Sequence, residues 1–198
     1  MNIEMTLGTL AGITQFLGYV VYVVIALKGK IKPNSSSWTM WTYGNILLTG
    51  TYIDMVSSMS LKILPAICAI SCVITWLIFI FKGKFEKMKW YEWYILGLDI
   101  AIGIFWFFSK DSKFAHLLID GTAFISFIPI TIEVYKHPED EDPLPWFIWA
   151  SAYSFLFVIT MEKEVKHIEE VIYPAMYTIF HFIIAVSAGQ REQKSPII

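Results

Sequence analysis

The stretch "WTMW", residues 38–41, decides the fold because it recurs as "WFIW" at residues 146–149, 108 positions later. Further identities at this offset are Thr14 with Thr122, Phe16 with Phe124 and Lys28 with Lys136. One residue later in register, "ILPA" at 63–66 aligns with "IYPA" at 172–175. A fixed offset that holds over this length indicates an internal duplication.

The composition indicates that the duplicated unit lies in a membrane. The chain has 198 residues, of which 56% are hydrophobic and only 16% are charged, whereas soluble domains carry roughly a quarter charged residues. Seven apolar runs approach or reach the about 20 residues that a helix needs to cross a bilayer. They are residues 6–27, 36–57, 63–81, 93–108, 114–135, 144–161 and 171–188. The alternating polarity of a membrane β-barrel is not visible, so the spans are predicted to be helices.

The offset relates the first three spans to the last three and leaves the fourth unmatched. Three helices reverse the direction of the chain across the membrane, and one extra crossing restores it. We therefore expect an all-α membrane protein with two parallel three-helix repeats joined by a linker helix, a 3+1+3 plan. The predicted parts are a single transmembrane domain over 1–190, with repeat one at 6–81, linker helix at 93–108 and repeat two at 114–188, and a cytoplasmic tail at 191–198.

Basic residues predict the orientation. With the N-terminus outside, 10 of the 15 Lys and Arg residues fall in inside segments and 5 in outside segments, as the positive-inside rule requires. The start "MNIEMT" is acidic and the first apolar run is long, so we expect no cleavable signal peptide. The predicted location is a bacterial or archaeal plasma membrane, with the C-terminus in the cytoplasm.

The 3+1+3 plan with an outside N-terminus resembles the SWEET and PQ-loop superfamily. That superfamily includes sugar facilitators, lysosomal amino-acid exporters and KDEL receptors, and bacterial nicotinamide riboside transporters have a similar architecture. The segment "GKIKPNSSSWTMWTYGNILL" at 29–48 is similar to the loop and second helix of a PQ-loop repeat. "LIDGTAFISF" at 118–127, followed by "WFIW", is more similar to the nicotinamide riboside transporters.

The chain departs from the superfamily at its signature dipeptide. "FIPI" at 127–130 stands where the second Pro-Gln pair is expected, so Ile130 replaces the Gln, and Val21 stands where the first repeat would have its Pro. The proline set of the sugar facilitators is also missing. These departures put the substrate in doubt more than the fold.

The duplicated Trp pair leads to the candidate binding residues. Residues three or four apart share one helical face, so Trp41 is followed on its face by Asn45 and Thr49, and Trp149 is followed by Tyr153. The resemblance implies that Trp41 and Asn45 bind solute, because the related transporters use Trp and Asn. Interhelical hydrogen bonding is the alternative for Asn45. For the pair that opens these helices, Trp38 and Trp146, we expect anchoring in the aromatic belt at the inner interface.

Ionisable residues within the spans are further candidates. Asp120 is predicted to contact the solute, and Asp99 and His181 are candidates for proton coupling. The alternatives are polar pairing for Asp99 and a satisfied core position for His181. Prolines inside helices free backbone carbonyls, so each is a candidate hinge or a passive kink; they are Pro65, Pro129 and Pro174.

No phosphate loop, Cys/His metal cluster or nucleophile elbow is visible, so we expect neither an enzyme nor a resident metal or cofactor. The net charge of −2 offers no surface for nucleic acid. The predicted function is a transporter for a small polar or aromatic metabolite, such as a sugar, nucleoside or amino acid, that works by alternating access. The alternative is a receptor of the KDEL-receptor type, whose acidic loop at 139–142 either binds a basic partner or is simply solvated. Whether the chain forms a homo-oligomer stays open.

Overall fold

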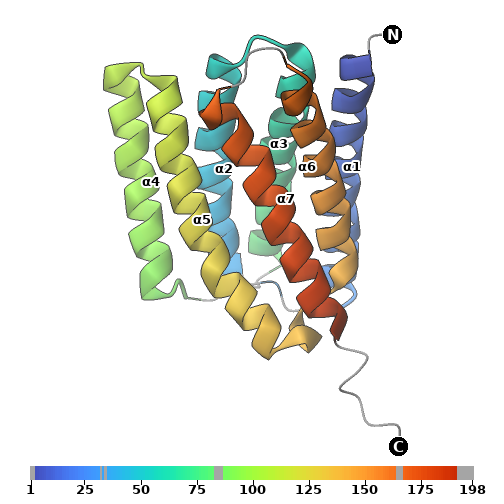
Figure 1. The fold of residues 1–198 in the computed structure, drawn as a ribbon. Coiled ribbons are helices and arrows are strands. Elements are labelled where there is room, and N and C mark those ends of the chain that lie inside the picture. Colours follow the sequence, from blue (N-terminus) through green and yellow to red (C-terminus); the bar gives the residue numbers. More distant parts are fainter. Residues whose placement is uncertain (1–2, 32, 34, 83–86, 164–166, 191–198) are drawn as a thin grey trace, which may run out of the picture.

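The computed structural model describes residues 3–31, 33, 35–82, 87–163 and 167–190, and the predicted tail at 191–198 lies outside them. This part of the chain folds into seven α-helices and one short 3-10 helix, without a strand (Figure 1). The helices are α1 Ile3–Leu27, α2 Ser35–Met55, α3 Met59–Phe81, α4 Trp90–Ser109, α5 Ser112–Lys136, α6 Pro143–Glu162 and α7 Ile168–Gly189, with η1 at Pro138–Asp140. The all-α prediction with seven long helices is confirmed.

Six of the seven helices are long and apolar enough to cross a membrane, as in a multi-pass integral membrane protein. The exception is α2, whose sequence is rich in Ser, Thr and other polar residues. Its neighbours α3, α4 and α5 all contact it. The bundle also exposes large apolar side chains along its outer faces, among them Ile13, Phe16 and Val20 on α1. Apolar surface of this extent is typical of contact with lipid rather than water.

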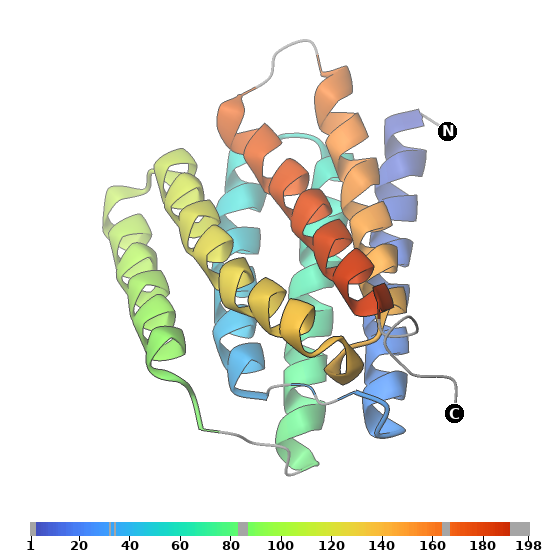
Figure 2. The same ribbon diagram turned by 60° about the horizontal axis from the view of Figure 1, so that its bottom comes forward.

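Two groups of three helices share one packing order. In the first group, α3 lies between α1 and α2 and contacts both; in the second, α7 lies between α5 and α6 and contacts both (Figures 1 and 2). The groups meet where α1 packs on α6 and where α2 packs on α5. Helix α4 stands at one edge, against α5 and α2.

Local sequence explains where the helices start and how closely they pack. Asp111 and Asp142 cap α5 and α6, because their carboxylates accept backbone N–H groups of Phe114 and Leu144 at 3.0 Å. Gly8 lets α1 approach α3 closely, since a Cβ there would lie 2.4 Å from the carbonyl oxygen of Ser60. Small residues commonly allow such contacts between membrane helices.

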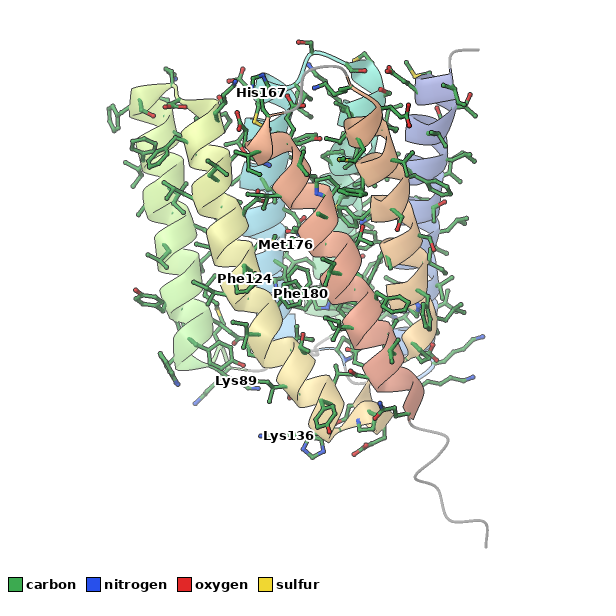
Figure 3. The ribbon with its side chains drawn as sticks, viewed as in Figure 1. Lys89, Phe124, Lys136, His167, Met176 and Phe180 are labelled. Carbon is green, nitrogen blue, oxygen red and sulfur yellow. The ribbon has the colours of Figure 1, made fainter. Side chains whose placement is uncertain are left out.

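The two ends of the bundle are named here after residues labelled in Figure 3. Lys89 and Lys136 lie at one end, and His167 lies at the other. The first turn of α1 lies at the His167 end and the last turn of α7 at the Lys136 end, so these two helix ends are on opposite sides of the bundle (Figure 1).

Candidate functional site

A cavity of about 50 Å³ lies between the two groups of helices, and we call it the central cavity. It is lined by Gln15, Tyr19, Trp38, Trp41, Asn45, Cys68, Cys72, Ser126, Phe127, Trp146, Trp149, Tyr153, Tyr177 and His181. A water molecule needs on the order of 10–15 Å³ by this measure, so the cavity has room for a few waters. Every α-helix except α4 contributes to its wall.

Most of the lining residues form pairs at the offset found in the sequence. Four pairs are separated by 108 residues, and they are Tyr19 with Phe127, Trp38 with Trp146, Trp41 with Trp149 and Asn45 with Tyr153. Two more pairs are separated by 109 residues, Cys68 with Tyr177 and Cys72 with His181. Only Gln15 and Ser126 remain outside this pairing within the lining set. The residues matched by the sequence offset therefore converge on one cavity.

The two Trp pairs have nearly the same local geometry. The rings of Trp38 and Trp41 meet edge to face with centroids 5.7 Å apart, and those of Trp146 and Trp149 do so at 5.2 Å. The expectation that Trp38 and Trp146 are belt residues is wrong, because they are only 3% and 2% exposed and line the central cavity. They share a helical face with Trp41 and Trp149, and that face points into the bundle rather than toward the membrane surface.

Trp149 is fitted closely against α1. A Cβ at Gly18 would lie 2.4 Å from the indole Nε1 of Trp149, so only glycine leaves room for this ring. The ring of Tyr19, on the same helix, lies 5.0 Å from Trp149 and 6.1 Å from Trp38. Trp149 Nε1 is buried without a hydrogen-bond partner among the described residues. It therefore offers a free donor at the cavity wall.

Some polar atoms of the cavity wall already form hydrogen bonds with neighbouring residues. Asn45 donates to the Trp41 carbonyl oxygen at 2.8 Å and accepts from the Cys68 thiol at 3.3 Å, so it joins α2 to α3. The hydroxyl of Tyr153 accepts from that of Tyr173 at 3.3 Å. Gln15 Oε1 has no partner among the described residues. The wall thus presents a free acceptor on Gln15 and a free donor on Trp149, and it contains no Asp, Glu, Lys or Arg.

His181 is part of the aromatic wall. Its ring stacks on Tyr153 with centroids 5.3 Å apart and an interplanar angle of 13°, and its Nδ1 donates to the Tyr177 carbonyl oxygen. Trp146 and Trp149 lie within 6 Å of the same ring. His181 therefore contacts aromatic rings and a backbone carbonyl among the described residues, and its role in proton coupling stays a prediction.

Three other predicted residues lie outside the central cavity. Thr49 donates its hydroxyl proton to the Pro65 carbonyl oxygen at 2.9 Å and so fastens α2 to α3. Asp99 accepts from Thr122 at 2.6 Å and lines a smaller cavity of about 20 Å³ beside Asn45. Asp120 is 3% exposed and faces His116 rather than the cavity. The structure therefore separates these residues from Trp41, Asn45, Trp149 and Tyr153, which it brings together.

The three prolines have different surroundings. Pro65 and Pro174 are buried inside α3 and α7, and both helices continue past them. Pro129 is half-buried in α5 and lines a second cavity, described next. Their role as hinges stays a prediction.

A second cavity of about 150 Å³, which we call the vestibule, adjoins the central cavity toward the Lys136 end. The two share Trp38, Trp41 and Ser126 in their walls. The vestibule is otherwise lined by Tyr22, Ser37, Met40, Tyr91, Pro129, Ile130, Glu133, Val134, His137, Asp140 and Glu141. The vestibule wall is therefore more polar and more acidic than the central cavity.

Glu141 is the buried acid of the vestibule. It is 6% exposed, and it accepts hydrogen bonds from the Tyr22 hydroxyl at 3.2 Å and from the Trp146 indole at 3.1 Å. Burial raises the pKa of Glu141 to about 7, although these two hydrogen bonds act in the opposite direction. The expectation of a simply solvated acidic loop is wrong at this residue, because it packs between α1 and α6.

The opposite side of the central cavity is closed by tyrosines. Tyr52 and Tyr173 are fully buried with ring centroids 5.1 Å apart, and Tyr173 lies 5.5 Å from Tyr153. These rings come from α2, α7 and α6. They fill the space between the central cavity and the His167 end of the bundle.

Several of these residues had no distinctive signal in the sequence. Gln15 is a single polar residue in an apolar span, which could have marked it, but the offset gives it no polar counterpart. Glu141 was hidden in a run of four acids.

Among the described residues, the ligand atoms of His137, Glu139 and Asp140 lie within 4.8 Å of one another, but they lie at the surface, where such groups are common without a metal.

Comparisons of this chain with models of protein families, with curated proteins and with solved structures found no match.

Proposed function

We propose that the chain is a membrane transporter for a small, uncharged polar or aromatic metabolite such as a sugar, a nucleoside or an amino-acid-like compound. In this proposal the two helix groups are parallel repeats joined by α4, and they rock about the central cavity. The observation that carries it is the lining of that cavity, in which four residue pairs at an offset of 108 and two at an offset of 109 meet from both groups. Transport sites commonly lie at the interface between repeats.

The helices support the repeat. Helices α1 and α5 each have 25 residues, α2 and α6 have 21 and 20, and α3 and α7 have 23 and 22. The contacts of α1 with α6 and of α2 with α5 are the two contacts that a two-fold axis between the groups would interchange. This agrees with the architecture of the SWEET and PQ-loop superfamily that the sequence resembles.

The chemistry of the cavity supports an uncharged solute. Aromatic rings surround it, and a planar or sugar-like molecule can stack on such faces. Gln15 Oε1 and Trp149 Nε1 are an acceptor and a donor that a hydroxyl or amide group can satisfy. Few, well-placed polar groups in an apolar wall are typical of small-molecule sites.

Alternating access also requires a closed side and an open side. The vestibule extends from the central cavity toward the Lys136 end, and the tyrosines separate the cavity from the His167 end. If the N-terminus is outside, the vestibule lies on the cytoplasmic side of the central cavity and the closed tyrosine side faces outward. Because sites for drug-sized ligands occupy roughly 300 Å³ or more, the groups must separate further to admit a solute.

The test is flux into vesicles reconstituted with the purified protein. Radiolabelled glucose, uridine, glutamine and nicotinamide riboside would each be supplied outside, and uptake would be compared with that into protein-free vesicles. Uptake of at least one compound, competed by its unlabelled form, is the expected result. Binding without uptake would contradict transport and favour the receptor alternative.

A further inference from the structure

A second polar cluster lies outside the central cavity, on the side of the His167 end. His116 and Asp120 are one turn apart on α5 and are 0% and 3% exposed. Nε2 of His116 lies 3.8 Å from Oδ2 of Asp120, too far for a hydrogen bond. Neither this nitrogen nor either carboxylate oxygen has a hydrogen-bond partner among the described residues. Few other buried side-chain nitrogen or oxygen atoms of the described residues lack a hydrogen-bond partner.

The neighbouring Thr51 determines which nitrogen of neutral His116 carries hydrogen. The Thr51 hydroxyl donates to the carbonyl oxygens of Leu47 and Leu48, at 3.1 and 3.0 Å, which uses its only hydrogen. It therefore accepts from Nδ1 of His116, which lies 3.0 Å away. Neutral His116 then has its hydrogen on Nδ1 and a lone pair on Nε2. That lone pair faces the carboxylate of Asp120, so two acceptors confront each other.

We propose that His116 and Asp120 together bind one proton. A proton on Nε2 replaces the two facing acceptors by an ion pair and removes the net negative charge of the pair. The two atoms must then approach from 3.8 Å to about 3 Å to form an N–H···O hydrogen bond. Without it, an ionised carboxylate is buried without any described donor, which is strongly unfavourable in a protein interior. The reaction is simple association: the proton comes from water and no covalent bond breaks.

The atoms present fit a proton better than a metal ion. Hard cations such as Na⁺, Mg²⁺ and Ca²⁺ need about six or more oxygen ligands, whereas this pair offers one nitrogen and two carboxylate oxygens. The Thr51 hydroxyl is already committed to backbone carbonyls. The walls are the rings of Tyr52 and Tyr173, with centroids 5.2 and 5.7 Å from that of His116.

Other ionisable groups surround the pair but do not neutralise it. They are Tyr52 from α2, Asp99 from α4, and Glu169, Glu170, Tyr173 and Tyr177 from α7. Glu169 pairs with Lys113 at 3.4 Å, and Glu170 pairs with Lys163. Each of these acids therefore has its own cation, and Asp99 has the Thr122 hydroxyl. No described cation remains within ion-pair distance of Asp120 except His116 itself.

Tyr173 connects the proton site to the central cavity. Its ring contacts His116, and its hydroxyl donates to that of Tyr153, which lines the cavity. A change of charge at His116 and Asp120 therefore acts on the tyrosines that close the cavity toward the His167 end. The coupling of this proton to solute movement rests on the proposed transport function, but proton binding itself does not.

Proton binding can be tested by nitrogen NMR of purified protein with ¹⁵N-labelled histidine. The chain has four histidines, and the signal of His116 is identified by its loss in His116→Gln. We expect Nε2 of His116 to change from an unprotonated to a protonated shift as the pH falls. In Asp120→Asn the midpoint should move by about one pH unit or more, whereas Asp99→Asn, an acid buried nearby, should leave it in place. A His116 signal that does not titrate while the protein stays folded overturns the proposal, as does the same midpoint in wild type and Asp120→Asn.

Two further measurements apply if Asp120→Asn does not fold or if a solute is transported. If Asp120→Asn does not fold, proton uptake by wild type and His116→Gln after a pH jump is compared, and equal uptake overturns the site. If a solute is transported, a proton gradient should drive its accumulation in wild type, and His116→Gln should retain exchange of solute but lose accumulation. Flux that fails in wild type while His116 still titrates with Asp120 sinks the transport proposal and leaves the proton site standing.

Discussion

Cys72 on α3 and His181 on α7 are 109 residues apart and line the same cavity from opposite helix groups. At three paired positions the first group supplies the smaller residue: Asn45 against Tyr153, Cys68 against Tyr177, and Cys72 against His181. At these three pairs the cavity therefore has amide and thiol groups on one side and rings on the other, while both groups supply the remaining aromatic residues. In the proposed repeat the two copies supply matched positions, and the different residues at these three positions make the two sides of the cavity unlike.

The small wall can be probed through its thiols. Cys68 and Cys72 are the chain's two cysteines, and both are unpaired and buried at the central cavity. Because the vestibule adjoins this cavity, a small methanethiosulfonate reagent should modify them several-fold faster from the Lys136 side of a vesicle than from the other. Mass spectrometry would measure the rates, and a variant with both cysteines replaced by alanine gives the background. Equal rates from both sides would contradict the closed tyrosine layer.

The distribution of basic residues predicts the orientation. Reporter fusions after Lys30 and after Lys84 should both report a cytoplasmic position, because these segments belong to the basic-rich side. The measurement is the activity of alkaline phosphatase and fluorescent-protein fusions in cells. An external signal at either site would be incompatible with the 3+1+3 arrangement and an outside N-terminus.

Glu141 should make stability depend on pH. Its pKa is about 7 in the folded protein and about 4.3 in an unfolded chain, so the folded state binds the proton more tightly. The stabilisation is complete at low pH and is lost as the pH rises through about 7. We expect wild type to lose about 2 kcal/mol of unfolding free energy between pH 5 and pH 7 relative to Glu141→Gln.

The experiment for Glu141 is reversible unfolding in detergent micelles at the two pH values. Glu139→Gln is the matched control, because Glu139 belongs to the same acidic run but its carboxylate is 62% exposed. It should follow the wild-type pH dependence. If Glu141→Gln and wild type change in parallel, the buried carboxyl group is not the origin of the effect.

Gly18 tests the contact between the two helix groups. An added Cβ would collide with the Trp149 ring, so Gly18→Ala should displace that ring and cost about 1–3 kcal/mol of stability. Gly121→Ala is the control, because nothing lies within 4 Å of a Cβ built there, and it should be neutral or slightly stabilising. Unfolding free energies of both variants check this, and equal values would mean that α1 and α6 do not meet as described.

The sequence predicts much of the helix arrangement but less of the polar chemistry. Apolar run length and the 108-residue offset can both be read from the sequence itself. They predicted the helices and made Trp41, Asn45, Trp149 and Tyr153 candidates, and all four line the central cavity. The second predicted span, α2, lacks the apolar composition of the others. Its polar face packs against other helices, and contacts of this kind are not visible in a linear sequence.

The sequence does not reveal the hydrogen-bond partners of His116 and Glu141, because these partners are distant in the chain. The His116 and Asp120 spacing is visible in the sequence, but Thr51, which sets the tautomer, is 65 residues away. Glu141 looks solvated among its acidic neighbours, and only the approach of Tyr22 from α1 buries it. Position along the helix alone predicts a place at the interface for Trp38 and Trp146, whereas the face that each shares with the next Trp lies inside the bundle.

The central claim is that the two helix groups form one solute site. Substitution of Trp41 and Trp149 tests this claim most directly. Affinity for whichever panel compound is transported would be measured for Trp41→Ala, Trp149→Ala and the control Phe147→Ala, which removes an exposed ring from the same helix as Trp149. Loss of a desolvated aromatic contact costs on the order of 1–3 kcal/mol, so each Trp variant should bind roughly ten- to a hundredfold more weakly. Phe147→Ala should bind as wild type does. Wild-type affinity and flux in both Trp variants would contradict the assignment of the central cavity as the solute site.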